Sequence, residues 1–400
     1  MITPGSPERL VFLDVLRGVA LFGILLVNVF AFGADSIAWT DPADRGVWWV
    51  KHVFFESKFW VLYSLLFGMG LHIQLLSLRY TTAAMVRRLG FLMVIGCLHA
   101  LVFEGDILML YAELGLLMLI LKGLLLKRLS HRSMIWMAVV LAMSFPLGHL
   151  LGGDRGDDWP ANSASQAAQW LEQDRESSVF SIGTPGDVAS ELAQFIPERF
   201  WVDWQYPDSG WLVLASMLMG WWVMGVGLSR LALWSRRRVI ALCGFGWLAG
   251  GCLMVLERYA HHAFHYALFD RSDTAPITIF YMDIVYLSAT VFLAFAWFLS
   301  IWLWVHSDAM PALRLRVARA GRMSLSLYLM QTLIFTGVFY GYGLGYAYEL
   351  GPMQVAFLAL LIYGAQLLFA SLWSRYFLYG PMEWLWRWVT HLHRSPLRTD

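Results

Sequence analysis

Long apolar stretches, separated by short polar ones, recur along the whole chain. The first covers 10–32 and reads LVFLDVLRGVALFGILLVNVFAF. A bilayer core requires about 20 such residues in a helix, and the pattern predicts about ten membrane-spanning helices. The expected spans are 10–32, 53–77, 86–103, 107–126, 133–151, 209–233, 239–257, 276–305, 322–341 and 352–378. We therefore expect an all-α integral membrane protein, with residues 1–400 as a single polytopic domain in one bundle.

Lysine and arginine residues concentrate in every second connection, and cytoplasmic loops of membrane proteins carry this excess. The basic connections are 78–86, 122–132, 234–239 and 306–321, together with both termini. The longest opposite connection, 152–208, is acidic and too polar to span. We expect it to form an extracytoplasmic cap with helical pieces near 163–175 and 184–200. The pattern predicts a multi-pass protein of a bacterial cytoplasmic (inner) membrane, with both termini in the cytoplasm.

The composition agrees with a protein that lies in a lipid bilayer. Hydrophobic residues make up 59% of the chain and charged residues 14%, whereas soluble domains carry about 25% charged residues. A net charge of +1 gives no reason to expect a nucleic-acid partner. The three cysteines lie inside apolar stretches without metal-ligand spacing, so we interpret them as core residues. The oligomeric state is left open.

The first apolar stretch contains three polar residues, Asp14, Arg17 and Asn28. Asp14 and Arg17 are three residues apart and share a helix face, so they can neutralise each other. Ionisable groups within a membrane span are costly and usually mark a functional path. Two interpretations remain: an ion pair that fixes helix packing, or a polar track used by a substrate.

A short polar turn between the third and fourth expected spans follows His99 and contains Glu104 and Asp106. A histidine titrates near neutral pH, and a carboxylate can fix its tautomer, so His99 is a candidate general base. The alternative is a histidine that bonds to a neighbouring carbonyl beside a solvated turn.

A polar stripe marks the ninth expected span, where Ser324, Tyr328 and Gln331 recur at helical spacing. Polar groups in a span face protein or ligand, so the stripe predicts either substrate contact or polar packing between helices.

Two further groups are less specific. Glu56 and Lys58 lie near the start of the second span and either shape an outer cavity or mark its interface. His261 and His265 have the i, i+4 spacing of a metal pair. A third ligand does not accompany them, so we expect no metal cofactor.

The residues discussed above lie in segments that resemble the YeiB-like family, domain of unknown function 418. The matching segments are LDVLRGVALFGILLVN (13–28), SKFWVLYSLLFGMGL (57–71), RRLGFLMVIGCLHALVFEGDILMLYAELGLL (87–117), GRMSLSLYLMQTLIF (321–335) and GPMEWLWRWVT (380–390).

The segment around Asp14, Arg17 and Gly18 is also similar to a wider group of transmembrane acyltransferases. That group includes lysosomal heparan glucosaminide acetyltransferase and bacterial sugar-modifying enzymes. The sugar O-acyltransferases of the group have their active-site histidine where this chain has Asn28. The glucosaminide acetyltransferase has asparagine there and a histidine further on, but 32–51 contains no histidine here. His99 is therefore the best candidate base in this chain.

The resemblance implies a membrane acyltransferase whose donor is a thioester, most simply acyl-CoA. We expect the donor to dock from the cytoplasm near Arg9, Arg17 and Arg88. Asn28 would help to polarise the thioester carbonyl, and His99 would deprotonate a hydroxyl or amine of a small-molecule or glycan acceptor from the outer side.

Two other classes of function remain open. A proton-coupled transporter or flippase would use Asp14, Arg17, His99 and Asp106 as a path through the membrane. A membrane structural or resistance factor would perform no turnover.

Overall fold

The computed structural model describes residues 7–32, 39, 41–77, 80–122, 130–150, 172–173, 175–205, 210–267, 276–393 and 396–398. No strand occurs in this part of the chain, where one isolated bridge joins Phe377 and Arg398. The helices are α1 (Pro7–Phe30), α2 (Pro42–Phe54), α3 (Lys58–Leu76), α4 (Thr82–Ala100), α5 (Leu108–Leu121), α6 (His131–Ala142), α7 (Ser144–Leu150), α9 (Val179–Ile182), α10 (Pro185–Gln205), α11 (Gly210–Trp222), α12 (Leu228–Leu231), α13 (Arg236–Ala267), α14 (Pro276–Val305), α15 (Pro311–Arg322), α16 (Ser324–Phe339), α17 (Pro352–Trp373) and α18 (Pro381–His391).

The predicted all-α membrane class is confirmed. Seven helical stretches of the described chain are long and apolar enough to cross a membrane, and the apolar helices α5, α6 and α16 are shorter. Each of the predicted spans coincides with at least one of these helices. The break between α11 and α12 is a π-helical turn, Val223–Gly227, inside one continuous apolar stretch.

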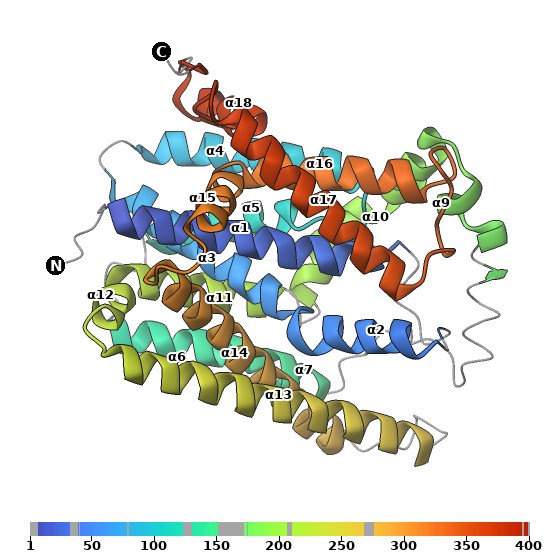
Figure 1. Cartoon of the computed structure of the whole chain (residues 1–400), viewed down its shortest axis with the longest axis horizontal. Coiled ribbons are helices and arrows are strands. Elements are labelled where there is room, and N and C mark those ends of the chain that lie inside the picture. Colours follow the sequence, from blue (N-terminus) through green and yellow to red (C-terminus); the bar gives the residue numbers. More distant parts are fainter. Residues whose placement is uncertain are drawn as a thin grey trace.

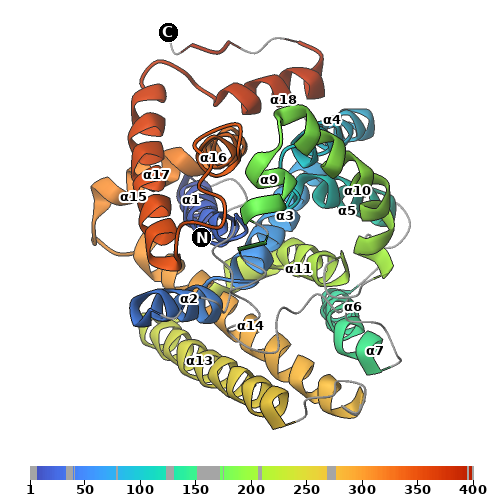
Figure 2. The ribbon, with the colours of Figure 1, turned by 90° about the vertical axis from the view of Figure 1, so that its right-hand side faces the viewer.

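The helices form one elongated bundle with α1 near its centre (Figures 1 and 2). In its apolar segment α1 is 61% buried, whereas the corresponding segments of α13 and α17 are only 28% buried. The last two helices therefore leave most of their apolar surface available to lipid. The start of α1 lies toward the same end of the bundle as α12, α15 and α18, and the cap helices α9 and α10 lie toward the other (Figure 1).

Glycines let α1 and α15 cross at very short range. A Cβ atom at Gly18 would collide with the backbone of Val317, and one at Gly321 would collide with the backbone of Asp14. Close backbone approach at small residues is the usual way for membrane helices to associate. This crossing places the Asp14–Arg17 turn directly against the junction of α15 and α16.

Three elements differ from the expectation. The second span begins earlier than predicted, because α2 precedes α3 and the two are separated by a break where Ser57 has a φ of 62°. Helices α15 and α18 occupy segments that were not expected to be helical spans. Both are amphipathic and too short to cross a bilayer, so a search for long apolar stretches passes over them.

The described part of the 152–208 cap contains the predicted helix near 184–200, which begins at Pro185 as α10. Thr184 and Asp187 bond reciprocally at its start. The Thr184 hydroxyl and backbone N–H both donate to the Asp187 carboxylate, and the Asp187 backbone N–H donates to the Thr184 hydroxyl. These bonds lower the pKa of Asp187 and fix the beginning of the helix. Most of the other expected helical piece, 163–175, lies outside the described residues.

Candidate functional site

His99 lies at the end of α4 and is held on both ring nitrogens. Its Nδ1 is 2.7 Å from Oδ1 of Asp106, and its Nε2 is 2.8 Å from Oγ1 of Thr332 on α16. All three residues are buried, with at most 6% of each exposed. An ionised carboxylate only accepts hydrogen bonds, so Nδ1–H donates to Asp106 and Nε2 is left to accept the proton of Thr332. The imidazole therefore has the tautomer of a general base.

The turn that carries Asp106 is built to place that carboxylate. Oδ2 of Asp106 accepts the backbone N–H of Met109 in the first turn of α5, at 2.9 Å. Arg199 of α10 donates to the carbonyl oxygens of Glu104 and Asp106. The cap thus fixes the backbone of the turn. Of the two carboxylates considered from the sequence, Asp106 bonds to His99, whereas the side chain of Glu104 is exposed.

Helix α16 contributes a row of hydroxyl groups that faces this turn. Ser324, Tyr328 and Thr332 follow one another at intervals of one helical turn, so the row extends about 12 Å along α16. The Tyr328 ring lies 5.0 Å from the His99 ring. Gln331, which the sequence grouped with this stripe, bonds instead to Gln366 of α17 at 2.9 Å. The row is therefore Ser324–Tyr328–Thr332, and Thr332 was not singled out from the sequence.

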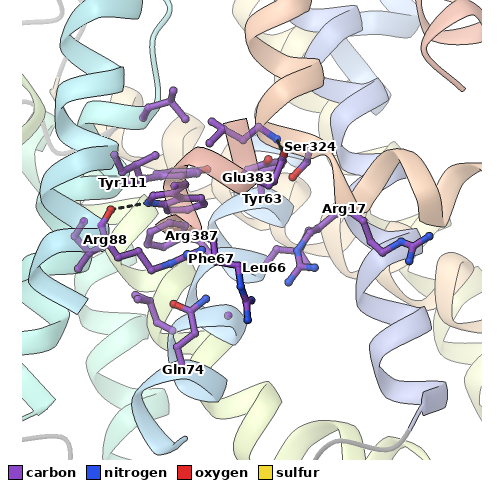
Figure 3. Close-up of a pocket in the computed structure, with 18 of the residues that line it drawn as sticks. Arg17, Tyr63, Leu66, Phe67, Gln74, Arg88, Tyr111, Ser324, Glu383 and Arg387 are labelled. Carbon is purple, nitrogen blue, oxygen red and sulfur yellow. Dashed lines mark hydrogen bonds between the residues drawn. The ribbon is translucent and has the colours of Figure 1, made fainter. Parts of the chain in front are cut away.

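A cavity of about 300 Å³ begins where Ser324 ends this row (Figure 3). Its lining combines charged, aromatic and apolar side chains from α1, α3, α4, α5, α16 and α18, and from the end of α15. The charged lining residues among those described are Arg17, Arg88, Arg322, Arg387 and Glu383. Tyr63, Tyr111 and Leu108 line the cavity together with Ser324. Leu108 is only two residues from Asp106, so the cavity approaches the His99 turn.

Helix α18 closes one side of this cavity by packing across α4. The guanidinium of Arg88 lies 3.5 Å from the centre of the Trp386 ring, and the indole N–H of Trp386 donates to the carbonyl of Arg88 at 2.7 Å. Arg87 donates to the carbonyl of Thr390 through two nitrogens. Arg88 is therefore held in the cavity wall by an aromatic face, and no carboxylate of the described residues forms an ion pair with it.

Glu383 of α18 caps the start of α16. Its carboxylate accepts the backbone N–H groups of Leu325 and Ser326 at 2.7 and 3.1 Å, and the Ser326 hydroxyl at 2.5 Å. A carboxylate at a helix N-terminus is stabilised by the helix dipole. Burial nevertheless dominates, and it raises the pKa of Glu383. Through this cap, α18 fixes the first turn of the helix that carries the hydroxyl row.

Comparison with known proteins identifies the family. A family described as "Protein of unknown function (DUF418)" matches residues 230–393. The chain is 30% identical over 395 residues to "Uncharacterized protein YeiB" of Escherichia coli, with 96% of both chains covered. The chain belongs to the YeiB-like DUF418 family. This YeiB-like protein is also 28% identical over 422 residues to "Uncharacterized protein YxaH" of Bacillus subtilis, across 98% of this chain and 96% of that one. No solved structure matches it.

The YeiB-like chain pairs Asp14 with Arg17 as predicted, at 2.9 Å. The Asp14 side chain is 21% exposed and that of Arg17 is 32% exposed, so the pair is only partly buried. Arg17 also lines the 300 Å³ cavity, and the Asp14 backbone contacts Gly321. The turn that carries this pair therefore packs against α15 at the helix crossing and also borders the cavity.

The sequence assigns Asn28 and His99 to the same acyl-transfer step. Neither residue lines the 300 Å³ cavity. Asn28 is half-buried and makes no side-chain hydrogen bond to another described residue. Asp106 and Thr332 already occupy both nitrogens of the His99 ring, and Phe103 packs against it at 5.9 Å. The side chain of Arg9, the third expected donor contact, lies outside the described residues, as do those of His261 and His265.

A second polar cluster surrounds the break between α2 and α3. Glu56 forms an ion pair with Lys51 and also contacts Nδ1 of His52, both on α2. Lys58 is completely buried, and its ammonium donates to the carbonyl of His52 at 2.8 Å. Ser57 and Tyr286 bond through their hydroxyls at 2.5 Å. The sequence indicated Glu56 and Lys58, but it could not show that Lys51 and His52 converge on them.

Proposed function

We propose that this protein is a membrane acyltransferase that moves an acyl group from a thioester donor, acyl-CoA, to a hydroxyl or amine of an acceptor. One observation carries the proposal. His99, oriented as a base by Asp106, lies at one end of a polar row whose other end opens into an arginine-lined cavity.

The arginine-lined cavity suits the phosphate groups of the donor. Guanidinium groups bind phosphates through paired hydrogen bonds and keep their charge at all physiological pH values. Arg17 is neutralised by Asp14, and Glu383 offsets one more charge, so the described lining keeps an excess of positive charge. The apolar side chains Leu66, Leu92 and Leu108 in the same lining suit the acyl chain.

The His99–Asp106 pair supplies the base. Proton transfer by a positioned imidazole contributes typically about 10²–10⁴-fold to a rate. The other ring nitrogen, Nδ1, needs a hydrogen-bond partner that holds the imidazole in one tautomer. Asp106 is that partner, at 2.7 Å. Because both hydrogen-bond partners of the imidazole are already in place, the site spends little free energy on reorganisation during the reaction.

The acceptor would approach from the end that carries the cap. A small hollow of about 30 Å³ lies there, beside the His99 turn. Phe32, Phe103, Glu104, Phe180 and Tyr340 contribute to its lining. Phe103 also packs on His99, so widening of the hollow would bring an acceptor next to the base. The excess of arginine at the other end favours a cytoplasmic position for the donor cavity, in a bacterial inner membrane.

The test is release of free thiol from acetyl-CoA by the purified full-length protein, with and without a panel of hydroxyl and amine acceptors. We expect continuous thiol release over many turnovers that depends on an acceptor. The His99→Ala variant should lose it by at least about 100-fold while reaching normal levels in the membrane. His306→Gln, a change at an exposed histidine, is the matched control and should leave release unchanged. Full release by the His99→Ala variant would contradict the proposal.

A proton-coupled transporter is the second candidate, and the buried cluster at the α2–α3 break favours it. A lysine that is 0% exposed in a membrane helix, such as Lys58, is a functional candidate by default. Substrate flux into proteoliposomes without chemical change, lost in Lys58→Met, would support transport over acyl transfer.

A further inference from the structure

Thr332, His99 and Asp106 form a hydrogen-bonded row of hydroxyl, imidazole and carboxylate. Nucleophilic acyl-transfer enzymes place a nucleophile, a base and an orienting acid in this order. We propose that Thr332 is the nucleophile of this protein and carries the acyl group as a covalent ester between donor and acceptor. This inference rests on the proposed acyltransferase function and adds a two-step route through Thr332.

The direction of the two hydrogen bonds to the His99 ring supports a nucleophilic threonine. Asp106 accepts from Nδ1 at 2.7 Å, so Nε2 bears the lone pair and Thr332 donates its hydroxyl proton to it at 2.8 Å. This is the arrangement in which a weak hydroxyl nucleophile is activated by an adjacent base. Thr332 is 4% exposed and His99 6%, so water has little access to the pair.

The position of Thr332 also argues against direct attack by the acceptor. The base atom Nε2 already holds the Thr332 hydroxyl. An acceptor that reacted directly would first have to displace that hydroxyl from a buried site. A hydroxyl already in place, at hydrogen-bond distance from its base, needs no such exchange.

In the first step, Oγ1 of Thr332 attacks the thioester carbonyl while Nε2 of His99 takes its proton. The tetrahedral intermediate collapses, the carbon–sulfur bond breaks, and the imidazolium returns the proton to the leaving thiolate. The products are acyl-Thr332 and the free thiol of coenzyme A. Asp106 stabilises the imidazolium during this step and remains ionised.

In the second step, the acceptor hydroxyl or amine attacks the ester carbonyl of acyl-Thr332. His99 takes the acceptor proton, the bond from Oγ1 to the carbonyl carbon breaks, and the proton returns to Thr332. The acceptor leaves as an ester or amide. Because the free thiol departs before the acceptor reacts, a donor from one end and an acceptor from the other need not occupy the site together.

Tyr328 is placed to stabilise the oxyanion in both steps. Its side chain is 3% exposed, lies one helical turn from Thr332, and packs on His99. The backbone N–H of Ile107 approaches its buried hydroxyl oxygen, but no acceptor for the hydroxyl proton lies among the described residues. A buried donor without an acceptor is costly, and a developing negative charge would supply the acceptor.

The experiment uses the purified full-length protein and radiolabelled acetyl-CoA, first without any acceptor. We expect about one free thiol per protein in a rapid burst and an acetyl group on the peptide that contains Thr332. Thr332→Val should abolish the burst and lower acetyl transfer by about 10³-fold or more, while Thr332→Ser restores both in part. Thr336→Val is the matched control. It removes a buried hydroxyl one turn further along, bonded to the carbonyl of Leu333, and should keep the burst.

Three results separate the outcomes. Acetyl-Thr332 in the wild-type protein supports the inference even where a valine variant folds poorly. Full transfer by Thr332→Val together with loss in His99→Ala would overturn the covalent route but leave the acyltransferase function standing. Absence of thiol release by the wild-type protein, with every acceptor in the panel, would overturn both.

Tyr328→Phe should lower kcat by about 10²–10³-fold without raising KM for acetyl-CoA, and an unchanged kcat would remove Tyr328 from the mechanism.

Discussion

Replacement of Asp106 by asparagine should change the tautomer of His99 while leaving the stability of the turn unchanged. The two carboxylate oxygens have separate partners, since Oδ1 bonds to His99 and Oδ2 accepts the N–H of Met109. An asparagine keeps the bond to Met109 through its oxygen. Its NH₂ group then faces Nδ1 of His99 and donates to it. The imidazole must move its proton to Nε2, where it can no longer accept the proton of Thr332.

The expected loss of activity is large because His99 would carry its proton on Nε2 and could not act as the base. The same substitution in a serine–histidine–aspartate triad lowers kcat by about 10⁴, which corresponds to about 5 kcal/mol of transition-state stabilisation. KM for acetyl-CoA should stay within about threefold, since Asp106 does not line the donor cavity. The free energy of unfolding should change little for Asp106→Asn. It should fall by about 1 kcal/mol or more for Asp106→Ala, which also loses the bond to Met109.

The assay combines thiol release from acetyl-CoA with thermal unfolding of the same detergent-purified samples. A kcat for Asp106→Asn within tenfold of the wild-type value, in a protein that unfolds normally, would refute the assigned tautomer. Equal loss of stability in the asparagine and alanine variants would instead refute the separate roles of the two oxygens.

Three further outcomes follow from the cavity and the helix crossing. Arg88→Gln should raise KM for acetyl-CoA about 10–100-fold with little change in kcat, because it removes a charged hydrogen-bond donor. An unchanged KM would indicate that acetyl-CoA binds elsewhere. Gly321→Ala should lower the free energy of unfolding by about 1–3 kcal/mol or more, whereas Gly337→Ala, where the space is open, should not. The raised pKa of Glu383 means that its protonated form stabilises the fold below its ordinary pKa. That contribution is lost as the pH rises through the raised pKa, and melting curves of Glu383→Gln should lack this decline.

The helical class could be predicted because it depends on local patterns. A run of apolar residues long enough for a bilayer must be a helix, since no other single segment satisfies its own backbone in lipid. The Asp14–Arg17 and His99–Asp106 pairs could also be predicted from the sequence. Residues three positions apart on a helix, or seven positions apart across a short turn, lie close together by geometry alone. Gln331 shows the limit of this reasoning. Its helical face was assigned from spacing, but a partner on α17 decided its contacts.

The remainder of the site depends on contacts between distant segments. Thr332 is 233 residues from His99, and its sequence neighbourhood carries nothing that marks a nucleophile. Its only local signal was the one-turn spacing from Tyr328. The cap that Glu383 forms on α16 likewise joins residues 57 and 58 positions apart. Such pairings follow from how helices pack, which the periodicity of a single helix does not contain.

The two ends of the hydroxyl row differ in how completely their polar groups are satisfied, and this difference indicates where a ligand is needed. At the His99 end, the carboxylate, both ring nitrogens and the Thr332 hydroxyl bond to one another, so the site is complete except for the Tyr328 hydroxyl. In the cavity, the arginines outnumber the carboxylates among the described lining residues even after Asp14 is counted. Excess positive charge in a partly buried space raises the free energy of the empty protein. An anionic donor would lower it, and its neutral acyl end would extend along the row toward the hydroxyl groups.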